Sequence, residues 1–339
     1  MQLLATPSPS GYERQIGVVI QEYAKRYCDE VSDYHGNIVA VQRGIGAKRI
    51  MIAAHMDVIG MLVMGISEDG MLYFVPIGST DIGILPGLRV TIWHNNKPVC
   101  GVIGRKAVHL LDDSEKMNIN PKELWIDIGC SSLRDSSLRV AIGDIVTFNA
   151  PATCLNDNTI CSPGLDNKAG VLAVCRIMQT MAKRTAVSDS FMYVFTTQEE
   201  IGCRGVQIVA QNLDIDQAYV IDAIHATDYP CINHLLYGFI NIGHGPVISI
   251  APEVSPDLCS RLIAVAQDHQ IAFQVDVKPR STNTEASFVQ LSKSTPQTAV
   301  VSIPIRYMHS PNEICCTDDI ENVSRLLEHI LVANSSSAE

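Results

Sequence analysis

The stretch FMYVFTTQEEIGCRG, residues 191–205, joins an apolar run to two adjacent carboxylates, Glu199 and Glu200. Its first part is rich in aromatic and β-branched residues, which is typical of a buried strand. Two neighbouring charges at the end of such a strand repel each other and cost free energy unless water or a cation receives them. The stretch is therefore either a solvated loop after a core strand or part of a metal site.

Three further apolar runs predict buried strands: RIMIAA (49–54), QAYVID (217–222) and TAVVSIPI (298–305). Between them, segments 10–27, 165–184 and 317–333 have the periodicity of amphipathic helices. In the first helix, Ser10 and Glu13 have the spacing of a capping box. Strands that alternate with helices predict an α/β domain in which helices sandwich a mixed, largely parallel sheet.

Residues 61–150 have a different pattern, with short apolar runs and little helical periodicity. Turn signals such as Asp69-Gly70 and Asn95-Asn96 separate these runs. We therefore predict a small all-β, barrel-like domain at 61–150, inserted into a discontinuous larger domain formed by 1–60 and 151–339.

The composition limits the classes of partner. A formal net charge of −11 argues against nucleic acid or an anionic membrane surface. The longest apolar stretch, 50–66, contains His55 and Asp57, which argues against a membrane span. Eleven cysteines without a CxxC pair, and an N-terminus without a secretion signal, predict reduced thiols and a cytoplasmic location.

Polar residues follow or interrupt the predicted strands at their carboxyl ends. His55 and Asp57 follow the first run, Asp222 ends another, and His309 follows the last, while Asp166 opens the second helix. Each alone has an ordinary interpretation, as a core histidine, a turn residue or a helix cap. Because open α/β sheets bind ligands outside the carboxyl ends of their strands, we expect these side chains to converge.

The converging set has a composition that suits metal ions. Two histidines and three carboxylates can hold a pair of zinc-like ions when one carboxylate bridges them. Asp57 would then orient the ring of His55. One carboxylate of the Glu199-Glu200 pair could face a metal while its neighbour serves as general base for a water molecule.

With these residues in place, nearly the whole chain resembles the glutamyl aminopeptidase family of dinuclear metallopeptidases. That family includes deblocking and tetrahedral aminopeptidases, and some members have been called cellulases or endoglucanases. The motifs that carry the resemblance are SPSGYE (8–13), AAHMDVIGMLV (53–63), ILPGLRV (84–90), GVIGRKAVHLL (101–111), LWIDIG (124–129), GLDNKAG (164–170), TTQEEIGCRG (196–205), VIDAIHATD (220–228) and IRYMHSPNE (305–313).

The resemblance implies a zinc-exopeptidase-like fold and removal of N-terminal residues from peptides with a free N-terminus. It implies two divalent ions per subunit, zinc first, with cobalt or manganese compatible. It also implies that the inserted domain drives dimerisation and that dimers assemble into dodecamers. The implied roles are a bridging ligand, Asp166; ligands of one ion, His55 and Asp222; ligands of the other, Glu200 and His309; and a general base, Glu199.

Three positions depart from the family pattern: Val58 replaces a common acidic residue, Lys168 a common arginine, and His244 a common basic residue. They put substrate preference in doubt but remove no implied ligand. Other interpretations remain open on the sequence alone. They are a related co-catalytic carboxypeptidase or deacylase, a metal-free glycosidase with paired carboxyls, and a metal-binding protein without turnover.

Overall fold

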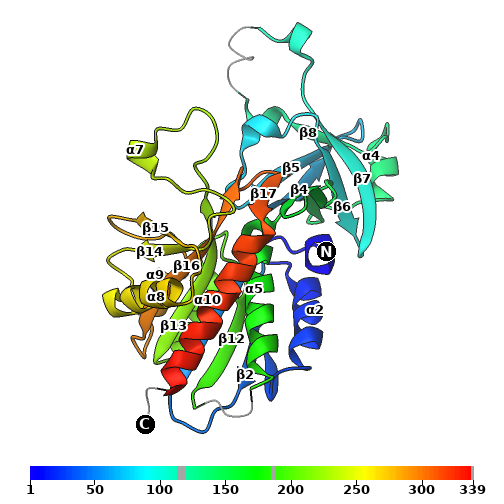
Figure 1. Ribbon diagram of the computed structural model, residues 1–339. Coiled ribbons are helices and arrows are strands. Elements are labelled where there is room, and N and C mark those ends of the chain that lie inside the picture. The colour runs from blue at the N-terminus through cyan, green and yellow to red at the C-terminus, as the bar shows by residue number, and fades with distance from the viewer. Residues whose placement is uncertain (113–118, 185–187, 337–339) are drawn as a thin grey trace.

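The computed structural model describes residues 1–112, 119–184 and 188–336. Two apolar cores organise these residues. The larger core surrounds a central sheet, and the smaller one fills a closed barrel above one end of that sheet (Figure 1).

The central sheet has eleven strands within the described residues. Four parallel strands form its middle, and antiparallel strands flank them, so the predicted mixed α/β sheet is confirmed. In spatial order the main path is β1 (Glu30–Tyr34), β2 (Asn37–Gln42), β12 (Ser190–Thr196), β3 (Arg49–His55), β13 (Gln217–His225), β16 (Gln297–Arg306), β17 (Glu313–Cys316), β11 (Thr159–Ser162) and β10 (Thr153–Asn156). Off this path, β14 (Val247–Ile250) pairs with β16 and with β15 (Gln274–Val277).

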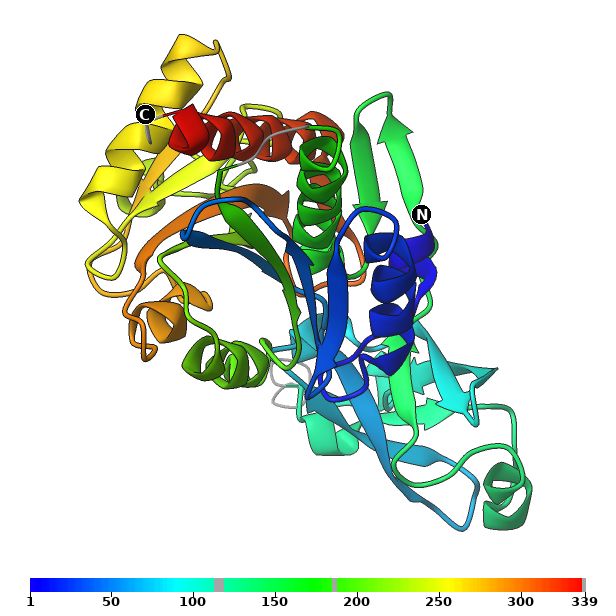
Figure 2. The same cartoon turned by 90° about the horizontal axis from the view of Figure 1, so that it is seen from below.

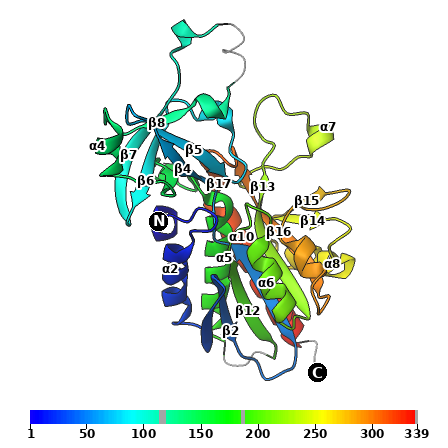
Figure 3. The ribbon, with the colours of Figure 1, turned by 180° about the vertical axis from the view of Figure 1, so that it is seen from behind.

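Helices cover both faces of the sheet (Figures 2 and 3). One face carries α2 (Arg14–Ala24), α5 (Leu165–Met181), α8 (Pro256–Asp268) and α10 (Thr317–Ser336), and the other carries α6 (Arg204–Asn212) and α9 (Ala286–Gln290). The three predicted helices are thus confirmed as α2, α5 and α10. The remaining helical turns are α1 (Gln2–Ala5), α4 (Leu133–Ser137), α7 (His234–Tyr237), η1 (Ile82–Ile84), η2 (Val108–Leu110) and η3 (Pro121–Glu123). None of the helices in the described ranges combines the length and apolarity that crossing a bilayer requires.

The predicted capping box at the start of α2 is wrong. The Ser10 hydroxyl donates to Asp57 Oδ2 at 2.5 Å instead of capping the helix. The Glu13 carboxylate accepts from the Gly11 amide at 2.7 Å, and the helix itself begins at Arg14. Both side chains therefore serve contacts outside the helix, which the local spacing could not indicate.

The barrel contains β4 (Gly60–Ile66), β5 (Leu72–Ile77), β8 (Trp125–Asp127), β7 (Lys97–Gly104), β6 (Arg89–His94) and β9 (Ile145–Phe148), in that spatial order. At the predicted hairpin turn, Asn95 and Asn96 both have positive φ, as a type I′ turn requires. After the barrel, β10 and β11 return to the central sheet by pairing with β17. The division into 1–60 plus 151–339 and 61–150 as domains stays a prediction.

The central strands end together just below the barrel (Figure 1). His55 is the last residue of β3 and pairs with Thr196 of β12. Strand β13 is longer than predicted and runs past Asp222 to His225, because it keeps its pairing with β16. On its other side, pairing with β3 stops at Val220, which leaves Asp222 free to face His55.

A buried carboxylate anchors α10 to the loop after α7. Asp319, in the first turn of α10, has no exposed surface and accepts hydrogen bonds from the Gly243 and Gly245 amides at 2.6 and 2.7 Å. Hydrogen bonds to charged groups contribute more to stability than neutral ones. This carboxylate therefore fixes the loop that carries His244.

We expect Asp319→Ala to lower the free energy of unfolding by about 3 kcal/mol, because two charge-assisted hydrogen bonds are lost. Urea denaturation followed by circular dichroism measures this change. The control is Asp257→Ala, an exposed acidic position in the first turn of α8, for which we expect a change within about 0.5 kcal/mol. Equal denaturation midpoints for the two variants would contradict the anchoring role.

Candidate metal centre

The five predicted ligand residues converge at the carboxyl end of the sheet. His55 Nε2 lies 3.2 Å from Asp166 Oδ1 and 3.3 Å from Asp222 Oδ1. His309 Nε2 lies 3.3 Å from Asp166 Oδ2 and 3.2 Å from Glu200 Oε2. Asp166 therefore stands between two imidazole rings, with one carboxylate oxygen toward each.

The local backbone of Asp166 directs its carboxylate into the centre. Asp166 and Asn167 have non-helical dihedral angles, so Asp166 is not the ordinary helix cap that its sequence position also allowed. The Asn167 side chain donates to the Ile221 carbonyl at 2.8 Å and accepts from the Gly170 amide at 3.1 Å. These bonds tie the start of α5 to β13 and bring Asp166 close to Asp222.

The donor atoms fit divalent metal ions. They form two groups, His55–Asp166–Asp222 and Asp166–Glu200–His309, and within each group the candidate ligand atoms lie within 4.8 Å of one another. Asp166 Oδ1 and Glu200 Oε1 are buried and have no hydrogen bond of normal geometry among the described residues. Unpaired buried oxygens are costly, and a cation would satisfy them. Imidazole and carboxylate donors suit zinc, cobalt or manganese.

The electrostatics of the centre point the same way. Burial lowers the pKa of His309, but Asp166 and Glu200 outweigh this effect and raise that pKa to about 11. Burial also opposes the charge on His55, yet Asp166 and Asp222 hold its pKa well above the ordinary value. Burial would raise the pKa of Asp166, but the two histidines lower it. The carboxylates thus create a strongly negative potential that favours positive charge at both imidazoles' positions.

The ring nitrogens that face away from the centre have carbonyl partners. His55 Nδ1 lies 3.1 Å from the backbone oxygen of Asp57 and 3.6 Å from its carboxylate. His309 Nδ1 lies 2.9 Å from the backbone oxygen of Ser79, a residue two positions after the end of the barrel strand β5. Such contacts fix the tautomer and leave Nε2 available as a ligand atom.

Asp57 also holds the loop that carries the two glutamates. Its Oδ1 accepts from the Glu199 amide at 3.0 Å, and its Oδ2 accepts from the Glu200 amide at 3.2 Å and from the Ser10 hydroxyl. Sequence reasoning predicted an action of Asp57 on the His55 ring alone. The carboxylate lies 3.6 Å from that ring and also holds the backbone of the loop that follows β12.

Glu313 is a residue that sequence reasoning missed. It is buried, and its carboxylate accepts from the Asp166 amide at 3.0 Å and from the His309 amide at 2.8 Å. Burial raises the pKa of Glu313 to about 8, and the charge of Asp166 adds to this. Its position four residues after His309, within the motif IRYMHSPNE, was the available signal.

Glu199 lies beside the two ligand groups and belongs to neither. Its Oε2 is 3.9 Å from His55 Nε2, and its Oε1 accepts from the Cys203 thiol at 3.2 Å. Burial raises the pKa of Glu199 to about 8. The charge of Glu199 also acts on the missed residue Glu285, which is fully buried; neither of its carboxylate oxygens has a hydrogen bond of normal geometry among the described residues, and burial raises its pKa well above the ordinary value.

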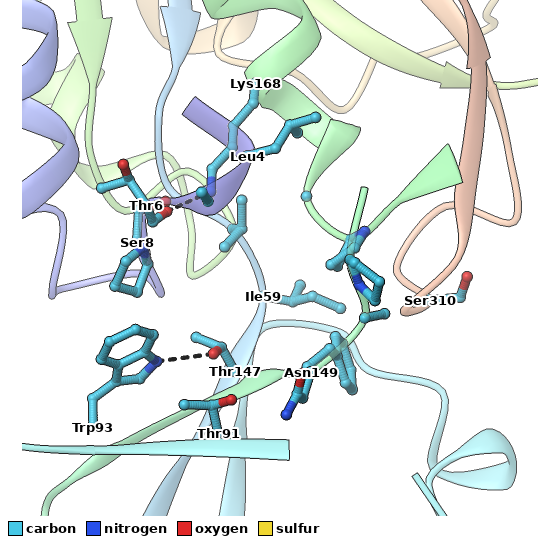
Figure 4. A pocket seen from close by; sticks show the side chains of 18 residues that line it. Leu4, Thr6, Ser8, Ile59, Thr91, Trp93, Thr147, Asn149, Lys168 and Ser310 are labelled. Atoms are coloured by element: carbon cyan, nitrogen blue, oxygen red, sulfur yellow. Dashed lines mark hydrogen bonds between the residues drawn. The ribbon is translucent and has the colours of Figure 1, made fainter. Parts of the chain in front are cut away.

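A pocket lies between the barrel and the larger part of the chain (Figure 4), lined by barrel residues such as Trp93 and Thr147 and by Lys168 of α5. None of the five candidate ligands lines it. Lys168 donates from Nζ to the Thr6 carbonyl at 2.7 Å, and burial lowers the pKa of its ammonium to about 7. Val58 and Lys168 both border Gly164, since a Cβ there would lie 2.9 Å from Val58 Cγ1 and 3.8 Å from Lys168 Cδ. Two of the three departures from the family pattern are therefore spatial neighbours, whereas His244 is exposed on the loop that Asp319 holds.

Solved structures share this fold over almost the whole chain. The TET aminopeptidase of the marine sediment archaeon Thaumarchaeota archaeon SCGC AB-539-E09 superposes with a TM-score of 0.92 at 28% identity, covering 97% of this chain and 94% of that one. The TET1 peptidase of Pyrococcus horikoshii gives 0.85 at 29% identity and 97% of both chains. A structure named endoglucanase from Thermotoga maritima gives 0.78 at 26% identity, covering 97% and 95%. Fold and site thus define a zinc-exopeptidase-like hydrolase.

Sequence comparison identifies the family within this class. Residues 36–326 match the M42 glutamyl aminopeptidase family, and the lysyl aminopeptidase of Pyrococcus furiosus is 30% identical over 97% of this chain and 95% of its own. The chain belongs to the M42 glutamyl aminopeptidase family. It is a metal-dependent aminopeptidase, as the resemblance in its motifs predicted.

We expect Asp166→Asn to lower metal affinity at least about 100-fold, because both ligand groups contain Asp166 and replacement of even an outer-shell partner costs 10–100-fold. Elemental analysis after equilibrium dialysis measures the bound metal. The exposed Asp268→Asn serves as control and should bind metal like the unaltered protein. Full metal content in folded Asp166→Asn would exclude the bridging role.

Proposed function

We propose that this aminopeptidase uses two divalent ions held by five residues, with Glu199 as general base. The observation that carries the proposal is the place of Asp166 between the rings of His55 and His309, with Glu199 just outside both ligand groups. Asp166 would be shared by both ions, with His55 and Asp222 completing one site and Glu200 and His309 the other. Zinc is the first expectation, and cobalt and manganese suit the same donors.

Glu199 performs the proton transfers. Bound divalent ions would supply Lewis acidity, lowering the pKa of a water molecule and polarising the scissile carbonyl. Glu199 takes the proton from that water and passes it to the leaving amine. Oε1 of Glu199 accepts a hydrogen bond from the Cys203 thiol. The proton is therefore carried by Oε2, the oxygen that lies 3.9 Å from His55 Nε2. Asp57 supports this step by holding the backbone amide of Glu199.

The centre selects peptides with a free N-terminus. A free terminal amine would bind one of the ions or the carboxylates beside them, which include Glu199. A blocked N-terminus lacks this amine. This accounts for release of one residue at a time from the N-terminal end.

We expect Glu199→Gln to lower kcat by about 10²-fold or more while both ions stay bound, because the base is lost and no ligand is removed. A panel of aminoacyl-p-nitroanilides and short peptides, assayed after reconstitution with zinc, cobalt or manganese, measures this effect. A chelated sample is the control for metal dependence. Near-normal turnover by metal-loaded Glu199→Gln would rule out the base role, and chelator-insensitive hydrolysis of β-glucan would favour the endoglucanase name instead.

We also propose that the subunits assemble into a dodecamer through contacts of the barrel. The TET1 peptidase of P. horikoshii is described as assembling into a tetrahedron or an octahedral shell. On this chain's barrel, Met64 of β4 and Tyr73 and Val75 of adjacent β5 are exposed apolar side chains on paired strands. Apolar groups gathered on one surface are typical of an interaction site.

Sedimentation velocity tests the assembly. We expect a species of about twelve 37.0 kDa subunits. Val75→Asp should shift the distribution toward smaller species, because a charge in an apolar contact is costly. The control is Val277→Asp, at an exposed apolar position on β15 of the central sheet, which should leave the distribution unchanged. If both variants assembled like the unaltered protein, the contact between subunits would lie elsewhere than at Val75.

The cysteines favour a reducing compartment. All eleven are free thiols in the structure, and six of them are exposed or partly exposed. Free thiols persist in the cytoplasm and not in oxidising environments. We therefore propose a cytoplasmic location.

A further inference from the structure

The motif SPSGYE, residues 8–13, has no role in the proposed reaction so far. Its first part lies alongside the chain just beyond His55. The Val58 amide donates to the Ser8 carbonyl at 3.0 Å, and the Ser10 amide donates to the Val58 carbonyl at 3.1 Å. This short parallel bridge places Ser10 on Asp57 and carries the chain on to Glu13.

The loop after β12 is held by side chains from the N-terminal part of the chain. Its successive backbone amides at Thr197, Gln198, Glu199 and Glu200 all donate to side-chain oxygens, at 3.0, 3.0, 3.0 and 3.2 Å. The acceptors are Asn37 Oδ1, Glu13 Oε1, Asp57 Oδ1 and Asp57 Oδ2. All of these acceptor residues are buried. The direction of the loop therefore depends on residues far away in sequence.

The backbone at Gln198 needs such support. Gln198 has a φ of 56°, in the left-handed region that costs a non-glycine residue about 1 kcal/mol or more. The loop is closed by the Gly205 amide, which donates to the Thr197 carbonyl and brings Gly205 close to Asn37. A Cβ at Gly205 would lie 2.3 Å from Asn37 Oδ1, so only glycine permits this approach.

Glu13 holds the amide immediately before the proposed base. Its Oε1 accepts from the Gln198 amide at 3.0 Å and from the Gly11 amide at 2.7 Å, and 6% of the residue is exposed. The second bond fixes the carboxylate in its own turn, at the residue before α2. Glu13 is thus rigidly placed, and it determines the backbone position from which the Glu199 side chain departs.

We propose that Glu13 is a positioning residue for Glu199, acting through the Gln198 amide. The inference rests on the proposed role of Glu199 as general base. Asp57 holds the amides of Glu199 and Glu200 together, so it cannot separate the placement of the base from the placement of a ligand. Glu13 acts one residue earlier, at the Gln198 amide, so of the two glutamates its loss displaces Glu199 before Glu200.

Two variants separate reach from charge. Glu13→Gln keeps an acceptor oxygen at the same reach and removes the charge, whereas Glu13→Asp keeps the charge and shortens the reach by one methylene. For Glu13→Asp we expect a 10- to 100-fold lower kcat, because a displacement of about 1 Å can cost 10²-fold in rate. KM and metal content should stay within about twofold of the unaltered enzyme. Glu13→Gln should retain most of the rate.

Hydrogen–deuterium exchange provides a readout that does not depend on turnover. In metal-free protein, we expect Glu13→Asp to accelerate exchange in peptides that cover residues 197–200, while Glu13→Gln stays close to the unaltered protein. Glu22→Ala, an exposed position on α2, is the control and should change neither rate nor exchange. Melting temperatures of all variants report whether the fold is retained.

The outcomes are distinct. Slower turnover and faster exchange in Glu13→Asp alone support the inference. Two results overturn it: unchanged kcat and exchange in Glu13→Asp, or a larger loss in Glu13→Gln than in Glu13→Asp, which would make the charge decisive. Failure of the proposed base would appear separately, as full activity of Glu199→Gln, whatever the Glu13 variants do.

Discussion

The placement of one carboxylate between two imidazole rings is the constraint on which the rest of this structure depends. Asp166 faces His55, at the end of β3, with one oxygen and His309, after β16, with the other. The rings come from opposite ends of the chain, so the sheet must bring its carboxyl ends together before the centre exists. Glu200 and Asp222 add further negative charge in a buried place. Only cations can compensate such a cluster at low cost.

Carboxylates outside the two candidate ligand groups give the centre its rigidity. Glu313 accepts from the amides of Asp166 and His309, and Asp57 accepts from the amides of Glu199 and Glu200. Each therefore fixes two functional residues through their backbones. Acidic residues in this protein fall into two classes, those whose oxygens face the centre and those whose oxygens face amides. The second class sets the distances among the first.

The sequence allowed prediction of the four parallel strands of the central sheet, of three helices and of the convergence of the candidate ligands, because apolar runs and the polar residues at their ends are local patterns. The flanking strands of that sheet, such as β1, β2 and β17, were not predicted. Strand β4 was not predicted separately from β3. Residues 50–66 form one apolar stretch, and Asp57 is the only polar residue between the end of β3 and the start of β4. The capping box failed because Ser10 is recruited by Asp57, a long-range contact. Ser79 was missed for the same reason, since its contact with His309 joins positions distant in sequence, whereas Glu313 had one signal, its place in the motif IRYMHSPNE.

The contact between His309 and the Ser79 carbonyl limits how this enzyme can be dissected. The segment after β5 belongs to the part of the chain that holds the barrel, yet it fixes the ring of His309, a residue of the candidate metal centre. Deleting the barrel to obtain a minimal monomeric enzyme would therefore remove the acceptor that sets the tautomer of His309. The two parts are not interchangeable modules. A chimera that exchanged the barrel for one from a relative would have to preserve this single backbone carbonyl.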